Sequence, residues 1–172
     1  MLDAQSPLGV DVCFERNGVT LSEDTSFTLT QVAGDDKAIK KALGKIPTKV
    51  GTAIDHDGRT LFRIGAKQFW ILGEAPSASD GIYITSLSSG RTRIFLEGPR
   101  ARDVLAACAL IDFNPREFKP GHFVMTGIHH TPVTIHCIAE NSFHIYALRT
   151  FALNIWEWLC DIAKGLDHAR HS

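Results

Sequence analysis

The sequence has no uninterrupted apolar run long enough to span a bilayer, and its first residues (MLDAQSPLGV) lack the basic region and long apolar stretch of a secretory signal. An excess of one charge is also missing, since the formal net charge is −1. A nearly neutral chain produces no strong field, which speaks against nucleic acid or an anionic membrane as a partner. The sequence therefore predicts a cytoplasmic protein that binds neither.

Cysteine is sparse, and no CxxC pair occurs among the four residues Cys13, Cys108, Cys137 and Cys160. Widely spaced cysteines in a cytoplasmic chain are typical of reduced, buried thiols. At 172 residues the chain is long enough to bury a sizeable core without disulfides or a structural metal.

The usual catalytic and nucleotide-binding motifs are absent as well. There is no GxSxG around Ser86, Ser88 or Ser89, no GxGxxG and no Walker A sequence. The acidic pair Asp35-Asp36 is typical of a helix start. We therefore predict no catalytic, cofactor-binding or metal-binding residue in this chain.

Histidine, a common metal ligand, occurs eight times. His136 and His144 lie on consecutive predicted strands and face each other if the connecting loop centres on Glu140. No third ligand is clearly placed beside them, so solvated or core-edge histidines remain the alternative to a metal site. His129-His130 lies in a predicted turn.

The pattern of strands and helices predicts an α+β fold with mainly antiparallel sheets. Each half reads strand, glycine, helix and three further strands, and a breaker-rich connection (74–80) separates the halves. We therefore predict a single domain, 1–172, with two related βαβββ halves at about 22–74 and 86–164. The expected strands are 27–32, 49–54, 59–64, 68–72, 93–97, 122–126, 133–138 and 143–148, and the expected helices are 35–46, 101–108 and 151–166.

The last helix is apolar on two sides. A core stripe at helical spacing is predicted at Phe151, Ile155, Trp158, Leu159, Ile162 and Leu166. Leu153, Trp156 and Cys160 lie on the far flank, so this helix is either sandwiched inside the chain or covered by another chain. Arg91 and Arg93 share a strand face, which either forms a solvated edge or binds an anionic ligand or an acidic partner surface. We predict a partner interface that includes Leu153, Trp156, Cys160, Arg91 and Arg93.

The second half resembles a known family, the gamma subunits of heterotetrameric sarcosine oxidase. The similarity spans about Ile84 to Ala163 as a series of moderately specific motifs in the right order. They are SSGRTRIFLEGP (88–99), the helix 101–109, IDF (111–113), FKPG (118–121), LRTFA (148–152) and WEWL (156–159).

The resemblance implies a subunit role. In that family, large alpha and beta subunits carry FAD, FMN, NAD and tetrahydrofolate, and oxidise sarcosine to glycine. The gamma subunit is small, holds no cofactor, and is similar in fold to the folate-binding domain of aminomethyltransferases. The resemblance thus implies a non-catalytic subunit, bound to larger alpha and beta subunits, in bacterial sarcosine catabolism.

Two alternatives remain open at this point. One is a free-standing folate-binding or aminomethyl-transferring domain. The wider fold family often has Asp where Ser86 stands here, which speaks against that alternative, whereas Gly98 matches the family glycine at the strand–helix junction. The other is a scaffold that associates only with itself.

Overall fold

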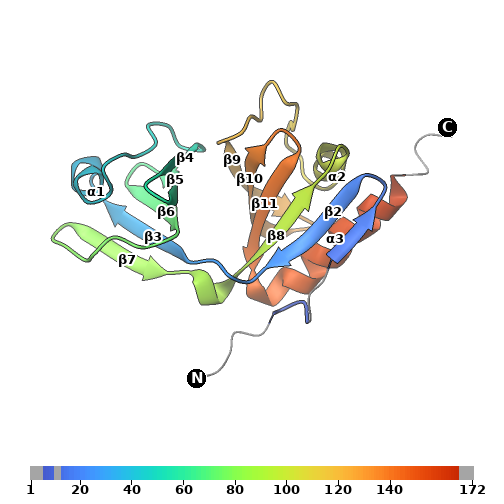
Figure 1. The fold of residues 1–172 in the computed structure, drawn as a ribbon, viewed down its shortest axis with the longest axis horizontal. Coiled ribbons are helices and arrows are strands. Elements are labelled where there is room, and N and C mark those ends of the chain that lie inside the picture. The colour runs from blue at the N-terminus through green and yellow to red at the C-terminus, as the bar shows by residue number, and fades with distance from the viewer. Residues whose placement is uncertain (1–5, 10–12, 167–172) are drawn as a thin grey trace. The chain divides into compact units, whose positions relative to one another are not determined.

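The computed structural model describes residues 6–9 and 13–166, and they form two compact units (Figure 1). Unit 1 joins the two ends of the chain, Met1–Thr25 and Gly90–Ser172, and unit 2 is the continuous segment Ser26–Ser89. Each unit has one antiparallel sheet and at least one helix. The predicted α+β class with mainly antiparallel sheets is confirmed.

Unit 1 contains a six-stranded sheet in the order β1-β2-β8-β11-β10-β9. Helices α2 and α3 contact each other, and α3 also contacts β1 and β11. A one-turn 3-10 helix, η2 (Arg149–Phe151), leads into α3. The bounds are β1 Cys13–Arg16, β2 Val19–Asp24, β8 Arg91–Glu97, α2 Ala101–Cys108, β9 Phe123–Ile128, β10 Thr131–Ala139, β11 Ser142–Leu148 and α3 Ala152–Gly165.

Unit 2 contains a five-stranded sheet in the order β4-β5-β6-β3-β7. Its strand order matches β9-β10-β11-β8-β2 of unit 1. The fourth strand in this order, β3 in unit 2 and β8 in unit 1, is followed along the chain by a helix. The origin of the halves by duplication stays a prediction. The bounds are β3 Leu29–Gly34, α1 Asp36–Leu43, β4 Ala53–His56, β5 Arg59–Gly65, β6 Gln68–Leu72, β7 Ile82–Ser86 and the 3-10 turn η1 Ser88–Gly90.

Alternation along the strands of unit 1 separates an apolar face from a more polar one. The apolar face packs against α2 and α3 and forms the core of the unit. Its strands contribute Leu21, Ile94, Leu96, Ile135, Cys137, Phe143 and Ile145, and its helices contribute Val104, Leu105, Ile155, Trp156 and Leu159. In unit 2, Ile39 and Leu43 of α1 cover Val32, Leu61, Phe69 and Ile71.

One helix end, one strand start and one whole strand are the main differences from the sequence prediction. Helix α1 ends at Leu43 and not at Ile46, because Gly44 takes φ 78° and its N–H donates to the carbonyl of Lys40 at 2.8 Å. Strand β4 begins at Ala53 and not at Lys49, since Thr52 turns back to bond the carbonyl of Lys49. Strand β7 was not predicted.

Gly98 lies where two stretches of main chain meet, just after β8. It takes φ +118°, and a Cβ at this position would collide with the carbonyl of Gly18 in the turn between β1 and β2. Unit 2 has a similar contact, since a Cβ on Gly34, the last residue of β3, would lie 2.5 Å from the carbonyl of Gly81, before β7. A side chain at either glycine therefore requires the backbone to move.

We expect Gly98→Ala to lower the free energy of unfolding by at least about 2 kcal/mol, because the substitution adds both a strained φ and a main-chain clash. Gly90→Ala is the matched control, since an added Cβ there meets nothing within 4 Å. Urea unfolding followed by circular dichroism measures both variants. Equal losses in the two would show that the close approach at Gly98 does not constrain the fold.

Candidate partner interface

Helix α3 buries a different stripe from the predicted one. Its buried residues follow at i, i+3, i+4, i+7, i+8 and i+11, and they are Ala152, Ile155, Trp156, Leu159, Cys160 and Ala163. The predicted core positions Phe151 and Trp158 are wrong, since they are 44% and 39% exposed. The small residues at the ends of the true stripe add little hydrophobicity, but they let the helix approach the sheet closely.

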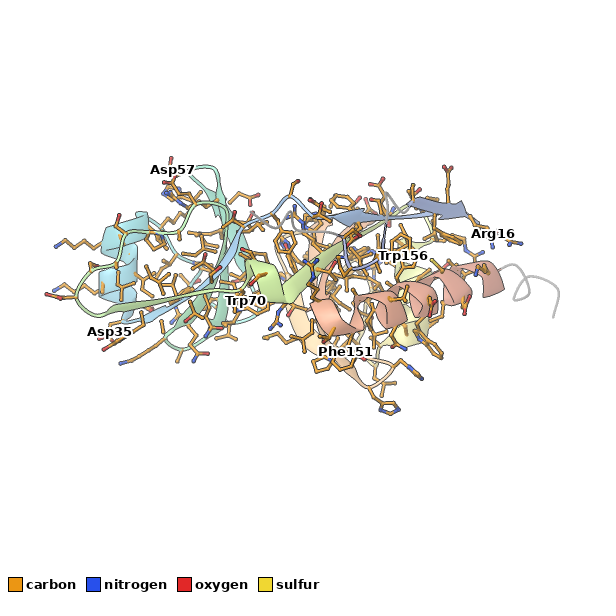
Figure 2. The ribbon with its side chains drawn as sticks, turned by 90° about the horizontal axis from the view of Figure 1, so that it is seen from below. Arg16, Asp35, Asp57, Trp70, Phe151 and Trp156 are labelled. Atoms are coloured by element: carbon orange, nitrogen blue, oxygen red, sulfur yellow. The ribbon has the colours of Figure 1, made fainter. Side chains whose placement is uncertain are left out.

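Two residues that were predicted to lie at a partner interface belong to the core. Trp156 and Cys160 are only 7% and 6% exposed and belong to the core of unit 1, so their predicted placement outside the core is wrong. Leu153, in contrast, is 51% exposed. In Figure 2, Trp156 lies on the side of α3 toward β1 and β2, and Phe151 lies at the start of the helix on its other side. The far flank is thus largely covered by this chain itself.

A groove remains between β1 and this flank of α3. It encloses a cavity of about 440 Å³. Its lining residues are Cys13, Phe14, Trp156, Glu157, Cys160, Asp161 and Lys164. Leu153 precedes Glu157 by one helical turn, so the exposed leucine lies in line with the helical wall of the groove.

The turn between β1 and β2 holds β1 against the end of α3. The side-chain amide of Asn17 donates to the carbonyl of Ala163 at 2.9 Å, and the backbone N–H of Arg100 donates to the carbonyl of Gly18 at 3.3 Å. Asn17 and Gly18 both have positive φ, 56° and 73°, as a type I′ turn requires. The local Asn-Gly chemistry therefore fixes one wall of the groove relative to the other.

Two thiols line the groove, and they differ in access. Cys13 is exposed, whereas Cys160 is buried, and burial raises the pKa of the Cys160 thiol to about 11. Burial also raises the pKa of Cys108 to about 12 and that of Cys137 to a lesser degree. At neutral pH these three thiols stay protonated, so Cys13 is the most accessible nucleophile among the four.

The predicted arginine pair does not form a free basic surface. Arg93 is 8% exposed and forms an ion pair with Asp24 of the neighbouring strand β2. Arg91 is half-buried, and the loss of hydration lowers the pKa of its guanidinium. Arg102, on α2, donates to the carbonyls of Phe118 and Glu140 at 3.1 and 2.8 Å, and its guanidinium lies over the ring of Phe143.

A polar row crosses the face of the unit 1 sheet opposite the helices. His136 and His144 are directly paired across β10 and β11, with ring centroids 6.2 Å apart. The turn pairs Ala139 with Ser142 and so centres between Glu140 and Asn141, and a bulge between Cys137 and Ala139 brings the two histidines into register. His144 also meets the ring of Phe95 edge-on at 4.5 Å, and Tyr146 follows two residues later. Burial, with smaller contributions from Arg93 and His136, lowers the pKa of His144 to about 3.

No cluster of three or more metal-ligating side chains occurs within residues 6–9 and 13–166. In the same part of the chain, no helix is both long and apolar enough to cross a membrane. Ser86, where the wider fold family often has Asp, is exposed at the end of β7.

The two tryptophans of α3 provide a matched pair. Trp156→Ala should lower the free energy of unfolding by about 3–5 kcal/mol, because it leaves a cavity in the core of unit 1. Trp158→Ala should cost no more than about 2 kcal/mol, since its side chain already meets water. Chemical unfolding monitored by circular dichroism distinguishes them, and a larger loss at Trp158 would contradict the corrected stripe.

The buried imidazole of His144 should make the protein acid-sensitive. Its pKa falls from an ordinary 6.5 to about 3 on folding, so below pH 6.5 the unfolded state takes up a proton that the folded state does not. Stability is therefore fully present above pH 6.5 and falls as the pH drops toward 3, by up to about 1.4 kcal/mol per pH unit. His144→Phe should flatten this slope in unfolding curves measured from pH 7 to 4. An unchanged slope would show that other groups cause any acid sensitivity.

Known proteins are similar to this chain in sequence and in fold. No family model matches the chain. Sarcosine oxidase subunit gamma from Corynebacterium sp. strain U-96 is 30% identical along an alignment of 168 residues, which covers 88% of this chain and 82% of that protein.

Two solved structures share the fold. A chain of the heterotetrameric sarcosine oxidase from Corynebacterium sp. U-96, in complex with pyrrole 2-carboxylate, superposes with a TM-score of 0.79 at 26% identity, covering 90% of this chain and 88% of that one. The glycine cleavage system aminomethyltransferase T from Bartonella henselae gives a TM-score of 0.65 at 18% identity, covering 84% of this chain and 46% of that one, and shows the fold alone. On its sequence and its fold together, the chain belongs to the family of sarcosine oxidase gamma subunits.

Proposed function

We propose that this chain is the small, non-catalytic subunit of a heterotetrameric sarcosine oxidase-like complex, a flavin- and folate-linked N-methyl amine oxidase. The observation that carries the proposal is the 30% identity to a gamma subunit along 88% of the chain. A chain of a heterotetrameric sarcosine oxidase with the same fold, at a TM-score of 0.79, supports it. The chain's work in such a complex is assembly and stabilisation.

In this proposal the chemistry belongs to larger alpha and beta subunits. FAD, FMN, NAD and tetrahydrofolate are held there, and this chain holds no cofactor. The complex is cytoplasmic and serves the breakdown of sarcosine in a bacterium. The polar row of His136 and His144 then has a structural role, since Phe95 and Tyr146 pack directly against His144.

We place the contact with a larger subunit at the groove between β1 and α3. Leu153 supplies an exposed apolar side chain beside the cavity, and Phe14 and Trp156 supply its apolar lining. Glu157 and Asp161 add carboxylates on the same flank, although Asp161 already pairs with Lys164 at 2.9 Å. An apolar centre with a charged rim is the usual anatomy of a specific protein interface.

A free-standing folate-binding or aminomethyl-transferring domain is not favoured. The likeness to aminomethyltransferase T, at 18% identity, concerns the fold alone. The serine at position 86, where the wider family often has an acid, gives the chain no evident group for that chemistry. Titration of the isolated chain with tetrahydrofolate by calorimetry tests this alternative directly.

The docking surface is tested by a pair of exposed leucines in unit 1. Leu153→Glu should weaken binding to the co-expressed larger subunits by about 2 kcal/mol or more, because the new carboxylate would lose its water inside the interface. Leu110→Glu is the control, since Leu110 is fully exposed and follows α2, away from the groove. Size-exclusion chromatography and titration of the purified chains measure the effect.

Two outcomes would contradict the proposal in different ways. If the unsubstituted chain fails to co-elute with any amine oxidase chain, the subunit role is wrong. If it co-elutes and Leu153→Glu behaves like Leu110→Glu, the role stands but the interface lies elsewhere. Maleimide labelling of Cys13 gives an independent test, because Cys13 lines the groove and is exposed in the isolated chain. Labelling should slow when a larger subunit covers the groove.

A further inference from the structure

Strand β9 forms one outer edge of the unit 1 sheet, opposite β1. It pairs with β10 in an unbroken register from Phe123↔His136 to Ile128↔Thr131. Its sequence, FVMTGI, contains no charged residue and no proline. Proteins usually protect an edge strand with charge, proline, a bulge or very short length, because an open edge pairs with other chains. Strand β9 has none of these protections.

The hairpin turn determines which main-chain groups of β9 point outward. A two-residue turn, His129-His130, joins β9 to β10, so the closing pair Ile128 and Thr131 is hydrogen-bonded. Hydrogen-bonded and non-hydrogen-bonded pairs alternate in an antiparallel ladder. Gly127 and Met125 therefore direct their N–H and C=O groups away from β10. Pro132, opposite Gly127, has no N–H, which agrees with this assignment.

Within unit 1, no strand pairs with the outward side of β9 at these two residues. Met125 is 54% exposed, and Gly127 is exposed as well. A Cβ added to Gly127 would find only the carbonyl of Thr131, at 3.8 Å. Two successive outward residues offer two donors and two acceptors, which is the template that an added strand requires.

The end of this edge is held in an unusual conformation. His129 and His130 have φ 45° and 64°, where Asn-Gly is the preferred pair, so the tip carries backbone strain. The His129 ring stacks on Trp158 of α3, with centroids 4.2 Å apart and an interplanar angle of 15°. The stack fixes the hairpin tip to the helix and so keeps the β9 edge straight up to its last residue.

We propose that an extended segment of a larger subunit pairs with β9 as a seventh strand of the unit 1 sheet. The inference rests on the proposed function, because the related solved chain comes from a heterotetramer and its partners are therefore different chains. An edge without charge selects for main-chain hydrogen bonds and apolar contact with Met125. The occupant is accordingly an uncharged stretch rich in aliphatic or β-branched residues.

The co-expressed complex, purified beside the isolated chain, gives the first test. Hydrogen–deuterium exchange resolved by residue should slow by about tenfold or more at the amides of Met125 and Gly127 when the complex forms. Unchanged exchange at both amides in a complex that does form would overturn the inference and leave the proposed function standing. Failure of the unsubstituted chain to form any complex would overturn both.

Substitutions at one residue give the second test. Gly127→Pro removes an outward donor and leaves the β10 ladder intact, so it should weaken the complex by about tenfold. Gly127→Ala keeps the donor and should bind within about twofold of the unsubstituted chain. If Gly127→Pro lowers the stability of the chain, Met125→Lys replaces it, because a charge protects an edge without touching the backbone. Equal binding by all these variants would overturn the inference.

Light scattering on the isolated chain tests whether the β9 edge binds a second copy of this chain instead of a larger subunit. A second copy of this chain can also pair through β9. If Gly127→Pro abolishes a homodimer and leaves the hetero-complex unchanged, the edge binds a second copy and the proposed occupant is wrong. Binding to the larger subunits that falls with Gly127→Pro, while the isolated chain stays monomeric, supports the proposed occupant.

Discussion

The turn at Asn17-Gly18 is the contact on which the arrangement of unit 1 depends. Its carbonyl at Gly18 lies against Gly98, where no side chain fits, and accepts a hydrogen bond from Arg100 at the start of α2. Its side-chain amide at Asn17 bonds the last turn of α3. One turn thus joins the edge of the sheet to both helices. Strand β1 ends at that turn, and the groove depends on the turn holding β1 at this position.

Unit 2 contains the same constraint in a different place along the chain. Gly34 ends β3 and lies against the carbonyl of Gly81 before β7, and Gly98, directly after β8, lies against the carbonyl of Gly18 before β2. The β5–β6 pair has a register shift between Arg63 and Gly65, and the β10–β11 pair has one between Cys137 and Ala139. Shared strand order, close glycines and matching bulges support the proposed duplication. Bulges are conserved features of a fold, and their coincidence by chance is uncommon.

Local chemistry made some of this fold predictable. Asn17-Gly18 and Asp57-Gly58 are pairs of residues that tolerate positive φ, so local sequence alone indicates both hairpin turns without knowledge of what packs on them. The pairing of His136 with His144 was predicted for a loop centred on Glu140, whereas a bulge between Cys137 and Ala139 produces it. The βαβββ order followed because each of its elements has its own periodicity and its own stop signals.

The face of α3 that is buried could not be predicted from the sequence. Hydrophobicity alone ranks Trp158 and Trp156 equally, and the choice between them depends on where the sheet lies. Ala152 and Ala163 are buried on the same stripe as Trp156, and small residues of this kind allow a helix to pack closely on its neighbour. Strand β7 was missed for a different reason: it is an edge strand in which only Ile82 is buried, so the pattern of burial marks it weakly.

The two edges of the unit 1 sheet bear on how a subunit without its own chemistry can be held in place. The groove lies beside β1 and the unprotected edge is β9, so the two proposed contacts lie at opposite edges of one six-stranded sheet. A single contact leaves a small subunit free to pivot about it, whereas two separated contacts fix its orientation. The second contact forms within an already bound complex, so it pays little of the entropy of association and can be weak by itself. An edge strand with two outward residues is the right size for such a contact, because its few main-chain hydrogen bonds would not hold a partner alone.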